Sequence, residues 1–151
     1  MKIFLLPLLF LTIGNIALAQ SSKQVQWTYS AKKISDKVYE IHMTAAINGD
    51  YHLYAQHVGV DGPVPTTFTF TKNPLLTLQP GVKEVGKIVR KEEAVWKGTV
   101  SYFEKSVDFV QVVKLKGNAK TNLAGKVEFM VCNEKQCLPP ADIDFNVSIG
   151  D

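Results

Sequence analysis

Apolar and polar residues alternate with a period of two along much of this chain, which is typical of half-buried β-strands. The alternating apolar positions form four groups: Tyr39, Ile41, Met43, Ala45 and Ile47; Phe68 and Phe70; Val127, Phe129 and Val131; and Ile143, Phe145, Val147 and Ile149. The segment 107–115 is more continuously apolar, so we expect it to lie centrally in a sheet.

Turn signals separate these segments, as in Asn48-Gly49-Asp50, Asp61-Gly62-Pro63 and Lys116-Gly117-Asn118. Short strands at this spacing, with no convincing amphipathic helix, predict an all-β fold. The predicted architecture is an immunoglobulin-like antiparallel β-sandwich, with jelly-roll or barrel closure as the alternative. The cysteine–tryptophan signature of antibody domains is absent, because both cysteines lie together near the C-terminus.

The first 19 residues have the pattern of a secretory signal peptide. Lys2 is followed by an apolar stretch, and Ala17-Leu18-Ala19 forms a small-residue cleavage site. An N-terminal membrane anchor is the alternative, but Gly14 and Asn15 interrupt a stretch that is already short for a membrane span. We therefore expect residues 20–151 to form one domain in the bacterial periplasm, an oxidising compartment where disulfides persist.

Charge and length bear on two questions, which are nucleic-acid binding and the need for a stabilising disulfide. The formal net charge is +3, and no basic cluster or basic–aromatic stripe indicates nucleic-acid binding. A domain spanning residues 20–151 is large enough to bury a real core, so it does not need a disulfide in order to fold.

The two cysteines, Cys132 and Cys137, are separated by only four residues. A disulfide that closes so short a loop contributes about 2 kcal/mol to stability, against roughly 4–5 kcal/mol for a loop of a hundred residues. This proximity favours a reversible dithiol over a structural staple, although an inert hairpin clip remains the alternative. We expect the pair to close the tip of a hairpin, with Cys132 ending the strand 126–131. Pro139 should stiffen the loop.

A metal site is a weaker alternative. His42, His52 and His57 supply nitrogen ligands, but the cysteine spacing is wide for zinc and no second Cys or His pair accompanies it. We expect neither a metal nor any other cofactor.

The segment Val131-Cys132 to Cys137-Leu138-Pro139-Pro140 resembles the end of the N-terminal periplasmic domain of the thiol reductant DsbD. Upstream, the segment from Asn48 to Tyr54 is similar to the Asp-Gly-Tyr-Tyr-Leu-Tyr segment of that family, whose aromatic residues flank the redox pair. The resemblance implies that Tyr51, His52, Tyr54 and Pro139 lie beside the cysteines. It also implies a cap over the disulfide, made here by Glu92, Glu93 and Trp96.

The resemblance implies that the chain is a thiol–disulfide oxidoreductase or electron carrier that works through Cys132 and Cys137, and that the sulfur of Cys137 is attacked first. The implied partners are thioredoxin-like proteins, periplasmic disulfide isomerases and a separately encoded membrane thiol reductant. The chain departs from the family in three places: four residues rather than five separate the cysteines, His52 replaces a tyrosine, and Trp96 replaces the cap phenylalanine. The second functional class is a non-catalytic secreted binding module with a structural disulfide.

Overall fold

The computed structural model describes residues 23–150, so the predicted signal peptide lies outside the described residues. No helix within the described part is long and apolar enough to cross a membrane. Twelve strands are found in this range: β1 (Val25–Ser35), β2 (Val38–Ile47), β3 (His52–Tyr54), β4 (Thr67–Phe70), β5 (Leu76–Leu78), β6 (Lys83–Val85), β7 (Ile88–Glu93), β8 (Gly98–Glu104), β9 (Ser106–Leu115), β10 (Thr121–Phe129), β11 (Val131–Cys132) and β12 (Ala141–Ile149).

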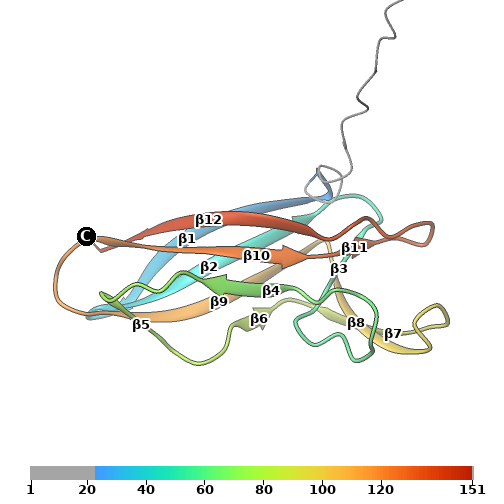
Figure 1. Cartoon of the computed structure of the whole chain (residues 1–151), viewed down its shortest axis with the longest axis horizontal. Helices are drawn as coiled ribbons and strands as arrows, with labels where there is room; N and C mark the ends of the chain where they lie inside the picture. The colour runs from blue at the N-terminus through green and yellow to red at the C-terminus, as the bar shows by residue number, and fades with distance from the viewer. Residues whose placement is uncertain (1–22, 151) are drawn as a thin grey trace, which may run out of the picture.

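The strands form three antiparallel sheets. One has the order β1-β2-β9-β5 with β6 also paired to β9, the second β12-β10-β4, and the third β11-β3-β8-β7. The first two sheets lie across one another in Figure 1, and their inner faces share one apolar core. The predicted immunoglobulin-like antiparallel β-sandwich is therefore confirmed. Strand β9 is central as expected, since it pairs with β2, β5 and β6.

Alternation along the strands places the core where the sequence pattern predicts it. The alternating residues of β2 are buried, and so are Phe129, Phe145 and Val147 of the facing sheet. Trp27 contacts Phe109 and Phe129, with ring centroids 5.8 and 5.5 Å away. It belongs to β1, a strand that the sequence analysis did not identify.

The chain between 126 and 132 differs from the single strand that we expected. Strand β10 ends at Phe129, and after Met130 the chain resumes as the short strand β11, which pairs with β3 instead of with β12. The Met130 carbonyl accepts a hydrogen bond from the Tyr54 amide at 3.4 Å. This switch of partner moves Cys132 out of the main sandwich and into the third sheet.

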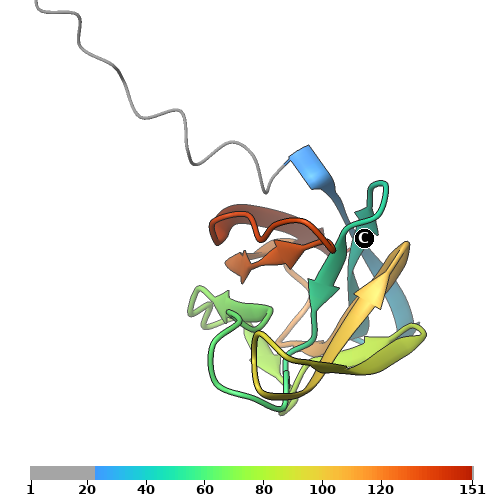
Figure 2. The same ribbon diagram turned by 90° about the vertical axis from the view of Figure 1, so that its right-hand side faces the viewer.

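The third sheet forms one end of the molecule, opposite the C-terminal end. The hairpin of β7 and β8 and the hairpin that joins β11 to β12 both project there, on the right in Figure 1, and Figure 2 looks onto that end. A second, smaller apolar cluster lies inside it, and its buried members are Tyr54, Val58, Val100, Tyr102, Met130 and Cys132.

Candidate functional site: the Cys132–Cys137 hairpin

Cys132 and Cys137 are disulfide-bonded and face each other directly across a tight hairpin, with their Cα atoms 4.0 Å apart. The turn between them is closed by the Asn133 amide, which donates to the Gln136 carbonyl at 2.9 Å. The Asn133 side-chain oxygen in turn accepts from the amides of Lys135 and Gln136, at 3.0 and 2.9 Å. Asparagine favours such turns because its side chain replaces a backbone acceptor.

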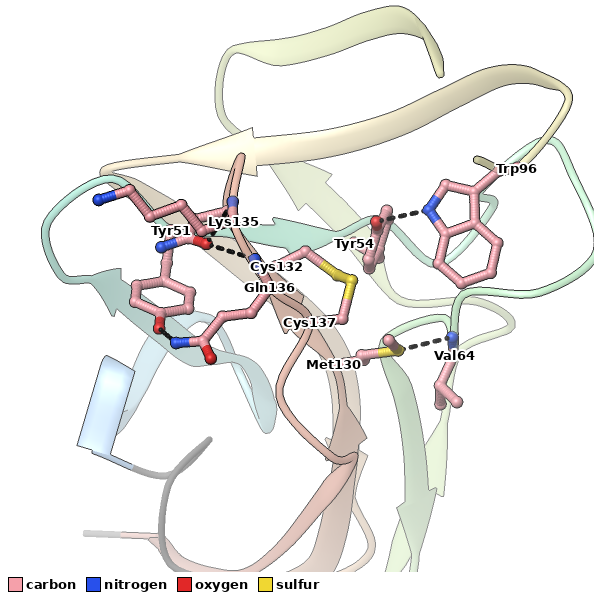
Figure 3. Close-up of a disulfide and its surroundings, with 10 residues drawn as sticks. Tyr51, Tyr54, Val64, Trp96, Met130, Cys132, Lys135, Gln136 and Cys137 are labelled. Carbon is pink, nitrogen blue, oxygen red and sulfur yellow. Dashed lines mark hydrogen bonds between the residues drawn. A yellow bond between two sulfur atoms is a disulfide. The ribbon is translucent and has the colours of Figure 1, made fainter. Parts of the chain in front are cut away.

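The turn between β2 and β3 supports this hairpin from one side. The Asn133 side-chain amide donates to Asp50 at 3.2 Å. The Gln136 side-chain amide donates to the Tyr51 hydroxyl at 2.9 Å (Figure 3). Tyr51 thus lies beside the cysteine loop, as the resemblance implied, and contacts it through Gln136.

The two cysteines differ strongly in exposure. Cys132 is only 2% exposed and belongs to the smaller apolar cluster, whereas Cys137 is exposed. Thiol–disulfide exchange requires access of the attacking thiolate to a sulfur atom. The accessible residue of the pair is therefore Cys137, and Cys132 is the buried one.

Trp96, in the turn between β7 and β8, packs against the smaller apolar cluster that contains Cys132. Its indole nitrogen donates to the Tyr54 hydroxyl at 3.1 Å (Figure 3). Its ring lies against Gly62, where a Cβ atom would come within 2.4 Å of the indole. Only a glycine at position 62 admits the tryptophan in this position.

A cavity of about 370 Å³ separates this turn from the cysteine hairpin. Six of the residues that the sequence analysis selected line it: His52, Tyr54, Glu93, Trp96, Cys132 and Cys137. Val95, which is 75% exposed, also lines the cavity. Glu92 is exposed and is not among the lining residues, so only the second of the two predicted cap carboxylates faces the disulfide. Pro139 is exposed and follows directly on the hairpin.

Lys91 connects strand β7 to the cysteine loop. Its ammonium group lies 2.9 Å from Glu93 and 3.0 Å from Glu134, and these two carboxylates raise the pKa of Lys91. Since Lys91 is half exposed, the contribution of these ion pairs to stability is small, but they link the β7–β8 hairpin to the cysteine loop.

His52 lies directly opposite Cys132 in the pairing of β3 with β11. Its ring stacks on Tyr102 at a centroid distance of 4.1 Å and meets the edge of Tyr54 at 5.2 Å. Burial lowers the pKa of His52, and the nearby carboxylates Glu93 and Glu104 partly oppose that shift. Burial also raises the pKa of Tyr54, against a smaller opposite effect of its hydrogen bond with Trp96.

The other two histidines lie elsewhere. The His42 imidazole lies 2.6 Å from Asp108 on the sandwich sheet, and His57 is exposed in the loop after β3. Within residues 23–150 no group of three or more His, Cys, Asp or Glu side chains is arranged to hold a metal ion.

Sequence reasoning missed three residues that shape the site: Met130, Gly62 and Asn133. The Met130 sulfur accepts from the Val64 amide at 3.4 Å, which fixes the loop that carries Gly62 beneath the indole (Figure 3). Asn133 was recognisable as a turn-forming residue, but the partners of Met130 and Gly62 are distant in sequence and left no local signal.

Comparison with known families supports this geometry. Residues 18–149 match the family described as thiol:disulfide interchange protein DsbD, N-terminal. The chain belongs to this family. DsbD N-terminal domains work with a disulfide and no cofactor, which agrees with the paired cysteines found here. No curated protein sequence matches the chain.

Two solved structures share the DsbD N-terminal fold with this chain. The reduced N-terminal domain of DsbD from Neisseria meningitidis superposes with a TM-score of 0.57 and 16% identity, covering 86% of this chain and 89% of that one. The N-terminal periplasmic domain of ScsB from Proteus mirabilis gives a TM-score of 0.52 and 14% identity, covering 83% of this chain and 44% of that one. At these identities the likeness concerns the fold.

Proposed function

We propose that this protein is a periplasmic thiol–disulfide exchange protein that passes electrons through Cys132 and Cys137 to or from thioredoxin-fold partners. The observation that carries the proposal is the asymmetric pair: an exposed Cys137 bonded to a buried Cys132 at a hairpin tip, in a chain of the DsbD N-terminal family. A predicted signal peptide at residues 1–19 supports the periplasmic location.

The exchange has two steps. A partner thiolate attacks the Cys137 sulfur, a mixed disulfide forms, and Cys132 leaves as a thiolate that takes up a proton. The partner's second cysteine then loses its proton and attacks the partner sulfur that is bonded to Cys137. Cys137 leaves as a thiolate and takes up a proton. Two electrons and two protons have then moved from the partner's dithiol to this pair. The reverse sequence reduces a partner's disulfide.

The arrangement of Trp96 suggests its role. Tyr54 belongs to the apolar cluster that contains Cys132, and the indole packs against that cluster, whereas Cys137 is exposed and lines the cavity. We propose that Trp96 shields the reduced Cys132 from small oxidants, and that the turn carrying Trp96 and Val95 moves aside when a partner docks. Glu93 would hold this turn near the cysteine loop through Lys91.

The test is the equilibrium potential of the pair, measured by equilibrating the domain in thiol–disulfide buffers and trapping free thiols with an alkylating mass tag. An exchange protein should show a midpoint between roughly −120 and −270 mV. A pair that stays oxidised below about −300 mV would identify a structural clip and favour a binding module instead. Cys132→Ser and Cys137→Ser should each abolish transfer, because each cysteine resolves the other.

A further inference from the structure

We propose that His52 is the acid–base residue of the exchange: it takes the proton from Cys132 when that buried thiol attacks the Cys137 sulfur, and returns it in the reverse step. This inference rests on the proposed exchange function and assigns a proton path to it. It concerns a position where the chain departs from the tyrosine of the DsbD family.

The geometry places the imidazole beside the buried sulfur. His52 and Cys132 are directly paired residues of antiparallel strands, and such side chains lie on the same face with Cβ atoms about 4.5–5.5 Å apart. Both residues line the same cavity as Cys137. The ring is held there between Tyr102, on which it stacks, and the edge of Tyr54.

Burial creates the need for a base at this point. A thiol that is 2% exposed ionises less readily than one in water, yet only the thiolate attacks a disulfide. Among the other titratable lining groups, Glu93 and Glu134 are both paired with Lys91, and Lys135 is exposed. The Tyr54 hydroxyl accepts the bond from Trp96 while burial raises its pKa. Histidine titrates nearest to neutral pH, so His52 is the group suited to accept the proton.

Charges from every neighbouring element act on the imidazole. These groups are Tyr54 on β3, Lys91 and Glu93 on β7, Tyr102 and Glu104 on β8, and Glu134 in the cysteine loop. Burial, the largest influence, lowers the pKa of His52; Lys91 acts in the same direction and the three carboxylates oppose it. In the oxidised protein at pH 7 the imidazole is therefore mostly neutral, which is the form that accepts a proton.

The attack of Cys132 on the mixed disulfide conserves both protons and electrons. With a partner bonded to Cys137, His52 removes the proton from the Cys132 thiol, and the resulting thiolate attacks the Cys137 sulfur. The Cys132–Cys137 bond forms while the bond to the partner breaks, so the partner leaves as a thiolate with the electron pair. The imidazolium then loses its proton to that thiolate or to water. In the reverse direction the imidazolium protonates Cys132 as it leaves.

Stopped-flow absorbance resolves two steps in time when the reduced protein reacts with Ellman's reagent. The first coloured thiolate is released as Cys137 forms a mixed disulfide, and the second as Cys132 attacks that disulfide intramolecularly. We expect His52→Gln to slow the second phase by about 100-fold and to leave the first unchanged, since general base catalysis typically contributes 10²–10⁴-fold. The wild-type second phase should rise with pH through an inflection below about 6.5, which the variant lacks.

Matched variants separate proton transfer from packing. His52→Phe keeps an aromatic ring against Tyr102 and should slow the second phase as much as His52→Gln does. His42→Gln, which changes a histidine outside the cavity, should alter neither phase. An unchanged rate and pH profile of the second phase in both His52 variants would overturn the inference. The midpoint potential of the wild-type pair is measured independently of these rates. A failure of the proposed exchange function can therefore be told apart from a failure of the His52 inference.

Discussion

The hydrogen bond between Trp96 and Tyr54 is the contact that most directly tests shielding of the buried cysteine. Tyr54→Phe removes the hydroxyl that accepts from the indole nitrogen at 3.1 Å and keeps the aromatic ring in the apolar cluster. If Cys132 reacts only when the turn carrying Trp96 opens, the reaction rate is proportional to the open fraction. Weakening the closed state should then raise that rate.

The expected size follows from the energy of one hydrogen bond. A neutral hydrogen bond contributes a net of about 1 kcal/mol, and about 1.4 kcal/mol corresponds to a factor of ten, so the open fraction should rise about fivefold. The range of about 0.5–1.5 kcal/mol for such bonds corresponds to roughly two- to twelvefold.

The assay measures alkylation of a lone buried thiol. In the Cys137→Ser background, Cys132 is the single cysteine of the chain, and its modification by iodoacetamide is followed by mass spectrometry. Tyr29→Phe is the matched control, because Tyr29 packs against Phe145 in the sandwich and its buried hydroxyl has no hydrogen-bond partner. Equal alkylation rates with and without Tyr54→Phe, or an equal increase in the control, would refute the shielding argument.

Three further predictions concern the same region. Gly62→Ala places a Cβ atom within 2.4 Å of the Trp96 ring and should speed alkylation of the buried thiol more than loss of the hydrogen bond does; Gly49→Ala, also at positive φ but with open space around it, should leave the rate unchanged. Serine at either cysteine should lower the free energy of unfolding by about 2 kcal/mol and leave the domain folded, as urea titration would show; a chain that no longer folds would mean that the disulfide is a required staple. Because burial lowers the pKa of His52 below its unfolded value, the stability that its neutral form contributes is present above about pH 6.5 and is lost as pH falls toward the folded pKa. Urea unfolding at pH 7 and pH 5 should therefore show a smaller acid-induced loss in His52→Gln than in the wild type, and equal losses would contradict the assignment.

Of the long strands with one buried face, the sequence pattern predicted β2, β10 and β12 but missed β1. Alternation identified the core residues of β2 and β12, and the continuously apolar run 107–115 indicated the central position of β9, because each of these strands contacts the core over many residues. Alternation has a limit in strand length. It did not identify β3, β5 and β6, which have only three residues each and show no period. The break at Met130 was also missed, since it depends on a hydrogen bond from Tyr54, far away in the sequence.

The site was predictable to the extent that it is local. The spacing of the cysteines and the turn-forming Asn133 lie within one hairpin, and the family resemblance placed Tyr51, His52 and Tyr54 beside it. The resemblance also suggested two cap carboxylates, Glu92 and Glu93. They are adjacent residues of strand β7, so their side chains point to opposite faces, and Glu93 is the one that faces the cavity.

The difference in exposure between Cys132 and Cys137 has no local origin, and under the proposed exchange it sets the order in which they react. Cys132 is buried because the loop after β3 and the turn between β7 and β8 converge on it, through the Val64–Met130 and Trp96–Tyr54 contacts. Cys137 is exposed together with Lys135 and Gln136, the two loop residues that precede it. In the proposed exchange Cys137 reacts first and the buried Cys132 must lose its proton under cover. We therefore expect pH and the proposed cap to control the rate of the second step rather than the first.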